Sequence, residues 1–149
     1  MSSIAMSSSA PEESRAVDRG RFALVGLSTV VAAVIANVVV FSMGSALVGY
    51  DPEFVVLKNV SATILFTLVP AIGAVLLYVL LLRFTRNPVQ VFTISAAVVF
   101  VVTLIPDFAY IPTVPGASVG QTAILVLMHV VAAGVIVGML TTHARPQSR

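Results

Sequence analysis

The sequence predicts an all-α membrane protein, a bundle of four transmembrane helices, and its composition and charge pattern support this. Strongly apolar residues make up 58% of the chain and charged residues only 9%, and the mean hydropathy is +1.07, far outside the range of soluble domains. The charged side chains leave four long stretches without a single charge, 22–50, 59–82, 87–106 and 108–144. A helix needs about 20 mostly apolar residues to cross a bilayer, so each stretch holds one crossing.

The first predicted helix covers residues 22–48. Residues 1–15, "MSSIAMSSSAPEESR", are rich in serine and too polar to bury a core, so we expect a disordered cytoplasmic tail there. The apolar run that follows Arg19 and Arg21 is much longer than the core of a secretory signal peptide. It therefore predicts a membrane helix and not a cleaved leader.

The second and third predicted helices cover residues 59–82 and 89–105. The segment "GYDPEF", 49–54, separates the first helix from the second with residues that favour turns. Pro70 lies near the middle of the second helix and is expected to kink it. The short basic segment "RFTRNP", 83–88, makes the second and third helices antiparallel neighbours.

The fourth predicted helix covers residues 121–142. It follows "PDFAYIPTVPGASVG", 106–120, whose three prolines and two glycines predict an irregular loop. Residues 143–149 form a second cytoplasmic tail. The chain is thus expected to hold a single transmembrane domain over residues 20–142.

Most of the positive charge is expected at one end of the predicted bundle. The other end receives one basic residue, Lys58, together with Asp51, Glu53 and Asp107. The basic end receives Arg15, Arg19, Arg21, Arg83, Arg86, Arg145 and Arg149. By the positive-inside rule both termini are cytoplasmic, which predicts a multi-pass protein of the cell membrane with an N-in/C-in topology.

Three polar residues lie deep inside the predicted spans. With a rise of about 1.5 Å per residue, Asn37, Thr67 and His129 fall in one layer near the middle of the bilayer. Polar side chains are costly in lipid and normally face the interior of a bundle. We therefore expect an intramembrane polar layer in which the His129 ring hydrogen-bonds to the Asn37 amide.

The residues around this layer also form faces. Small residues at 26, 33 and 44 share one seam of the first helix with Asn37, which permits close approach of a neighbouring helix. Asn59, Thr63 and Thr67 recur every four residues and form a polar stripe on the second helix. Both faces are expected to point into the bundle.

Gly134 and Gly138 form a GxxxG motif in the fourth helix. At 100° per residue they point almost opposite to His129, so they are candidates for contact with a second copy of the protein. The alternative is that they pack within the bundle or simply reflect the frequency of glycine in membrane helices.

Asp107 and Lys58 are candidate contacts at the outer mouth of the bundle. They are expected to pair there or to bind a cation or a substrate, and the alternative is a solvated carboxylate in a loop. The loop carries Phe108 and Tyr110 among its prolines, which suits a position in the membrane interface or a lid over an outer pocket.

Several functions are argued against. The absence of cysteine excludes thiol chemistry, and the arginines flank the spans instead of forming a basic domain for nucleic acid. We expect no metal, no cofactor and no enzymatic activity, because no carboxylate is placed beside His129 and no acidic residue is placed inside a span. The lipid bilayer is the one expected partner besides a second copy.

His129 is open to two interpretations. It either fixes packing through a hydrogen bond between helices or serves as a proton relay, a cofactor ligand or a substrate contact. The leading prediction is therefore a non-enzymatic structural or accessory membrane protein. The alternative is a small oligomeric transporter or ligand-binding membrane protein that uses the polar layer.

Several motifs resemble an uncharacterised prokaryotic family of four-helix membrane proteins, the domain of unknown function 6069. They are "TLVPAIGAVLLYVLLLRFTRNPVQVF" from residue 67, "LIPD" from residue 104 and "ILVLMHVVAAGVIVGML" from residue 124. The resemblance spans about residues 20–142, supports the four-helix fold and treats Pro70 and His129 as pattern positions. It implies no activity, and since such families end "SLVPP" where this chain has "TLIPD", no role for Asp107 is carried over.

Overall fold

The computed structural model describes the backbone of residues 10–143 and the side chains of residues 20–143. This part of the chain contains four α-helices and one 3₁₀ helix and no strand. They are α1 (Ala10–Val48), α2 (Val60–Phe84), α3 (Pro88–Ala109), η1 (Ile111–Thr113) and α4 (Val119–His143). Each α-helix contains a stretch that is long and apolar enough to cross a membrane, so the predicted all-α, four-helix class is confirmed.

Two predicted boundaries were wrong. Helix α1 begins at Ala10, so residues 10–15 are helical and not part of a disordered tail, while residues 1–9 and 144–149 lie outside the described part. Proline in the first turn, followed by two glutamates, is typical of a helix start, which explains the earlier beginning. Helix α3 continues through Pro106 to Ala109, four residues beyond its predicted end at residue 105.

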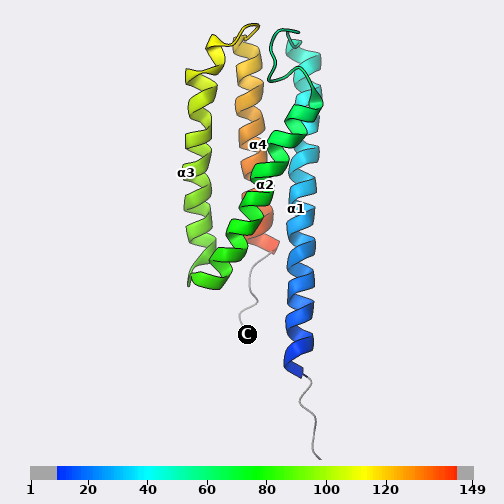
Figure 1. Ribbon diagram of the computed structural model, residues 1–149, viewed down its shortest axis with the longest axis vertical. Coiled ribbons are helices and arrows are strands. Elements are labelled where there is room, and N and C mark those ends of the chain that lie inside the picture. Colours follow the sequence, from blue (N-terminus) through cyan, green and yellow to red (C-terminus); the bar gives the residue numbers. More distant parts are fainter. Residues whose placement is uncertain (1–9, 144–149) are drawn as a thin grey trace, which may run out of the picture.

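The four helices form a bundle in which one helix lies obliquely across the others. In Figure 1, α1, α4 and α3 run side by side, and α2 crosses from α1 at one end to α3 at the other. The N-terminal end of α1 and the C-terminal end of α4 lie at the same end, here called the terminal end. The opposite end, which carries the connections 49–59 and 110–118, is called the loop end.

The seam of small residues on α1 faces the bundle, as predicted. Ala33 and Asn37 are buried, and Gly26 and Gly44 lie on the same seam. A Cβ atom at Gly26 would lie 2.9 Å from Cγ1 of Val75 on α2, and one at Gly44 would meet the Tyr50 hydroxyl and the Ile124 side chain. Glycine at these two positions therefore lets α1 approach α2 and α4 closely.

Two clusters of buried apolar side chains hold the ends of the bundle. The terminal cluster includes Tyr78, which stacks on Phe22 and meets the edge of Phe92 at 5.0 Å between ring centroids. The loop cluster contains Phe54, Leu57, Ile111, Leu125 and Met128.

Hydrogen bonds join the two connections at the loop end. The Gln121 side-chain amide accepts from the backbone N–H of Asp51 and donates to the carbonyl of Gly116, both at 3.0 Å. Gly116 has a φ of +75°, and a Cβ atom there would lie 2.8 Å from the backbone nitrogen of Phe54. The Tyr50 hydroxyl donates to the Phe41 carbonyl of α1 at 2.7 Å, so both connections are fixed to the ends of α1 and α4.

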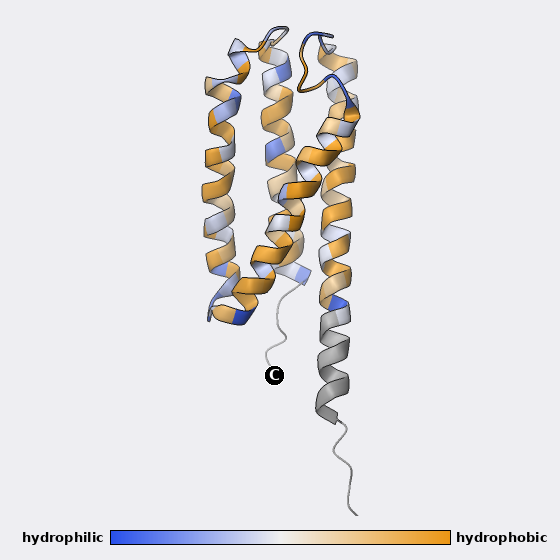
Figure 2. Cartoon of the chain, in the orientation of Figure 1, coloured by the Kyte–Doolittle hydropathy of each residue, from blue (hydrophilic) through white to orange (hydrophobic). Residues whose placement is uncertain are grey.

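The surface is consistent with a multi-pass membrane protein. Figure 2 shows apolar residues over most of the length of all four helices, with polar residues gathered near the ends and at a few inner positions. Large apolar side chains such as Leu24, Phe66 and Val101 are exposed on the outside of the bundle. Such an apolar surface matches a hydrocarbon surrounding.

Candidate functional site

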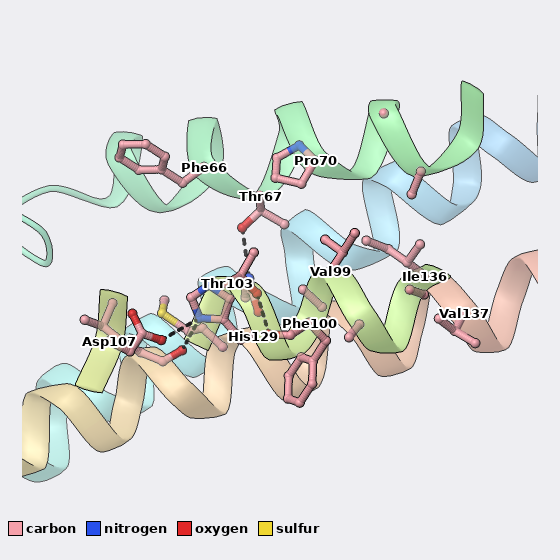
Figure 3. Close-up of a pocket in the computed structure, with 18 of the residues that line it drawn as sticks. Phe66, Thr67, Pro70, Val99, Phe100, Thr103, Asp107, His129, Ile136 and Val137 are labelled. Atoms are coloured by element: carbon pink, nitrogen blue, oxygen red, sulfur yellow. Dashed lines mark hydrogen bonds and ion pairs between the residues drawn. The ribbon is translucent and has the colours of Figure 1, made fainter. Parts of the chain in front are cut away.

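A cavity of about 720 Å³ lies among α2, α3 and α4. Asn37 of α1 also lines the cavity, and Leu57 lines part of its loop end. The close-up in Figure 3 shows α2 carrying Thr67 and Pro70 on one side and α3 and α4 facing them from the other. Most of the lining is apolar, which is typical of sites that bind small molecules.

The cavity contains an ion pair between α3 and α4. Nδ1 of His129 lies 3.1 Å from Oδ2 of Asp107 and 2.9 Å from the carbonyl oxygen of Leu125. The carboxylate is almost fully covered, with 7% of the side chain exposed, while 34% of the His129 side chain is exposed. The two side chains and their contact are visible in Figure 3.

The position of Nδ1 assigns the histidine tautomer. The Leu125 carbonyl accepts hydrogen bonds only, so Nδ1 carries the proton and donates it to that carbonyl, while the Asp107 carboxylate lies beside the same nitrogen and its Oδ2 makes no hydrogen bond. The other ring nitrogen, Nε2, has no partner among the described residues. In a neutral ring Nε2 accepts a hydrogen bond, and in a charged ring it donates one.

Asp107 is not where the sequence predicts it. It was expected in a loop at the outer mouth, beside Lys58, but it lies inside α3, is buried and pairs with His129. Lys58 is exposed and makes no ion pair within the described part of the chain. The predictions that no carboxylate supports His129 and that no acid lies inside a span were therefore wrong.

The sequence does contain a signal for this position. Ala96, Val99, Thr103 and Asp107 follow the three- and four-residue spacing of one helix face, and all four line the cavity. Because the helix is expected to end before Pro106, the sequence places Asp107 in the following loop and not on this helix face. Proline so close to the end of a helix removes one hydrogen bond but does not prevent a last turn.

Asn37 and Thr67 form a second polar contact in the cavity wall. Nδ2 of Asn37 donates to the Thr67 hydroxyl at 2.9 Å, and this hydroxyl donates to the Thr63 carbonyl at 2.8 Å. Oδ1 of Asn37 is buried without a hydrogen-bond partner. The predicted bond between Asn37 and His129 is not made, although both residues and Thr67 line the same cavity.

The remaining predicted positions fall on both sides of the bundle. Pro70 lies within α2 and lines the cavity. Gly134 and Gly138 are exposed, and a Cβ atom at either would meet nothing within 4 Å. The bundle therefore does not use these two glycines for packing, and their contact with a second copy stays a prediction.

The polar side chains that line the cavity carry hydroxyl, amide, carboxyl and imidazole groups. Within residues 20–143, no group of three His, Asp or Glu side chains is placed to hold a metal ion. The Thr103 hydroxyl near the pair donates to the Phe100 carbonyl at 2.8 Å. Ser95 also lines the cavity but lies twelve residues from Asp107 on α3, about 18 Å along the helix.

These features define a class of protein: a four-helix bundle of the membrane type with a polar pair inside an apolar cavity. Comparison with known families gives a more particular assignment. The chain belongs to the family of unknown function DUF6069, whose model matches residues 17–146, and the resemblance predicted from the sequence is thereby confirmed. No curated protein and no solved structure matches the chain.

Proposed function

We propose that this protein is a non-enzymatic membrane protein that binds a small, lipid-soluble molecule in the cavity among α2, α3 and α4. The observation that carries the proposal is the Asp107–His129 pair, which lies in the wall of an apolar cavity of about 720 Å³. The sequence predicts a structural or accessory role first, with a transporter or ligand-binding protein as the alternative. The proposal adopts the ligand-binding alternative.

A structural explanation of the pair is weaker on energetic grounds. Burying an ion pair costs desolvation free energy, which the attraction between the two charges often does not repay. An apolar pair of similar size often stabilises a protein as well or better. Ionisable residues inside membrane spans accordingly mark functional sites by default. The pair also leaves Nε2 of His129 unused, which is the nitrogen that a ligand needs.

The size and lining of the cavity support the same function. Pockets that bind small molecules enclose roughly 300–1,000 Å³ and combine apolar walls with a few polar groups. The cavity falls in this range, and its described polar groups come from few positions, among them Asn37, Thr67, Asp107 and His129. A bundle selected only for stability would fill such a space with side chains.

A structural or accessory role is the second candidate. The Asn37–Thr67 bond favours it, because this contact joins α1 to α2 and resembles the interhelical bonds that fix register in membrane bundles. The placement in the cell membrane with both termini in the cytoplasm is part of the proposal. Arg21, Arg83 and Arg86 near the terminal end support this orientation under the positive-inside rule.

Native mass spectrometry of the protein purified in a mild detergent tests the proposal. The wild-type protein is expected to carry a non-protein mass, which a double variant with Asp107→Leu and His129→Leu loses while it remains folded. The double substitution leaves no buried charge without a partner, so the variant is expected to fold. A loss of the bound mass then reports a loss of binding and not a loss of folding. His143→Leu is the matched control, because His143 is exposed at the end of α4 and does not line the cavity.

Two results would overturn the proposal. One is a wild-type protein that carries no added mass under any gentle condition. The other is a double variant that keeps the same ligand with the same occupancy as His143→Leu.

A further inference from the structure

We infer that the ligand is a single-chain amphiphile with an uncharged hydroxyl head, which enters from the lipid phase between α2 and α3 and hydrogen-bonds to His129. This inference rests on the proposed function and specifies the ligand of the same cavity. It follows from which sides of the cavity are closed, where its polar groups lie and what Nε2 of His129 is able to bind.

The loop end of the cavity is closed. Phe54 and Leu57 are fully buried in the loop cluster, and Leu57 itself lines the cavity. The bonds from Gln121 to Asp51 and to Gly116 hold the two connections together above it. A ligand dissolved in water therefore has no direct path along the axis of the bundle from this end.

The other inner sides are closed as well. Towards the terminal end, Phe92 and Ile136 line the cavity and belong to the buried terminal cluster, in which the Tyr78 ring packs on Phe92. On the side of α1, the hydrogen bond between Asn37 and Thr67 holds α1 against α2, and the two helices together close this side of the cavity.

The remaining side, between α2 and α3, opens outward. Phe66 of α2 and Val99 of α3 line the cavity and are 72% and 56% exposed. Gly73 lines it without a side chain, and a Cβ atom there would meet nothing within 4 Å. Since these helices are apolar enough to span a membrane, this opening faces the acyl chains, and the ligand must dissolve in them.

Polarity is distributed unevenly along the cavity. The ion pair lies towards the loop end, and beyond His129 the lining residues of α4 up to Val137 are apolar. These eight positions correspond to about 12 Å along the helix. On α3 the lining residues from Phe92 to Phe100 are apolar except Ser95. The pattern suits a molecule with one polar group and one apolar chain that runs from His129 towards the terminal end.

The free nitrogen of His129 selects the head group. A hydroxyl donates to Nε2 when the ring is neutral and accepts from it when the ring is charged, so it satisfies both states. A carbonyl only accepts, an ammonium group only donates, and a carboxylate would bring a second negative charge close to Asp107. The same hydroxyl chemistry is found in free long-chain alcohols and in single-chain membrane lipids.

Fluorescence quenching tests the ligand class directly. The chain contains no tryptophan, so Phe100→Trp places a single reporter in the cavity wall, and Phe108→Trp is the control on a 65% exposed side chain that does not line it. The probes are a long-chain alkanol brominated at the end of its chain and the matching brominated alkane. The alkanol is expected to quench the Phe100→Trp reporter at roughly tenfold lower concentration than the alkane, the factor for one hydrogen bond.

A plug variant tests the entry side. Gly73→Leu fills open space at the mouth, so it is expected to fold normally and to reduce quenching of the Phe100→Trp reporter to the level of the Phe108→Trp control. Gly20→Leu is the matched control, since Gly20 also lies in a helix, meets nothing within 4 Å and does not line the cavity.

The outcomes separate this inference from the proposed function. Equal quenching by alkanol and alkane, or full quenching in Gly73→Leu, overturns the hydroxyl head or the lateral entry even if native mass spectrometry shows a ligand. A wild-type protein that carries no bound mass overturns both. Mass spectrometry of the native ligand then assigns its source, since a single-chain lipid and a free alcohol differ in mass and in their fragments.

Discussion

The carboxylate of Asp107 and the imidazole of His129 lie 3.1 Å apart on two different helices, and the ring nitrogen that joins them is also 2.9 Å from the Leu125 carbonyl. The hydrogen bond to the Leu125 carbonyl orients the ring, and the buried carboxylate lies beside the same nitrogen without a hydrogen bond to it. The other nitrogen, Nε2, stays available for a ligand. Many sites in which a carboxylate orients one nitrogen of a histidine use the other nitrogen in this way.

The pair is expected to behave as a coupled unit in unfolding experiments. His129→Leu leaves the Asp107 carboxylate buried and unpaired, which should lower the free energy of unfolding by about 3 kcal/mol, the low end of the usual range because His129 is partly exposed. Adding Asp107→Leu should recover most of this loss. Thermal unfolding of both variants in one detergent measures the effect, and a double variant as unstable as the sum of the singles would contradict the coupling.

The bond between Asn37 and Thr67 is expected to contribute to stability without affecting the ligand head. Thr67→Val removes the acceptor and leaves the Asn37 amide buried without a partner, which should cost about 1–2 kcal/mol. Thr93→Val is the matched control, because the exposed Thr93 hydroxyl binds only the Val89 carbonyl of its own helix. Equal melting temperatures for the two variants would refute a role for the interhelical bond.

Contact with a second copy is expected at the face of Gly134 and Gly138. Gly134→Leu should remove a dimer from the native mass spectrum without lowering the melting temperature of the monomer, since the added side chain meets nothing within the bundle. Cross-linking in native membranes provides an independent measure. A wild-type protein that is monomeric in both experiments would exclude this partner.

Stability at alkaline pH is expected to depend on Tyr50. Burial raises the pKa of the Tyr50 hydroxyl above its usual value, so the folded state favours the protonated form, which also donates to the Phe41 carbonyl. The contribution is complete below about pH 10, the pKa in the unfolded chain, and is lost as the pH rises through the folded-state value. Unfolding curves across this range should show a drop in the wild-type protein that Tyr50→Phe reduces.

The parts of the structure that depend on local pattern could be predicted from the sequence. The four spans follow from the length of the charge-free stretches, and the buried seam around Asn37 follows from the helical spacing of small residues. Thr63 and Thr67 are buried for the same reason. Each of these features repeats along the chain with the period of a helix, so a single sequence contains the information.

The position of Asp107 and the existence of the cavity could not be predicted in the same way. Proline at position 106 indicates a helix end, yet the last turn of α3 tolerates it and carries the carboxylate to α4. The cavity depends on the oblique path of α2 across the bundle, which tertiary packing decides. Periodicity specifies which face of a helix is buried but not the angle between two helices.

The attachment of α2 at both of its ends has a mechanical consequence. At the loop end, Tyr50 and Asp51 tie the preceding connection to α1 and α4, and at the terminal end a turn of only three residues, 85–87, joins α2 to α3. A helix whose two connections are both held is expected to swing outward less easily than a free one, so the width of the mouth should change little. Rotation of the exposed Phe66 side chain, which takes place within nanoseconds, is therefore expected to change the opening between α2 and α3 more readily than the slower movement of a whole helix.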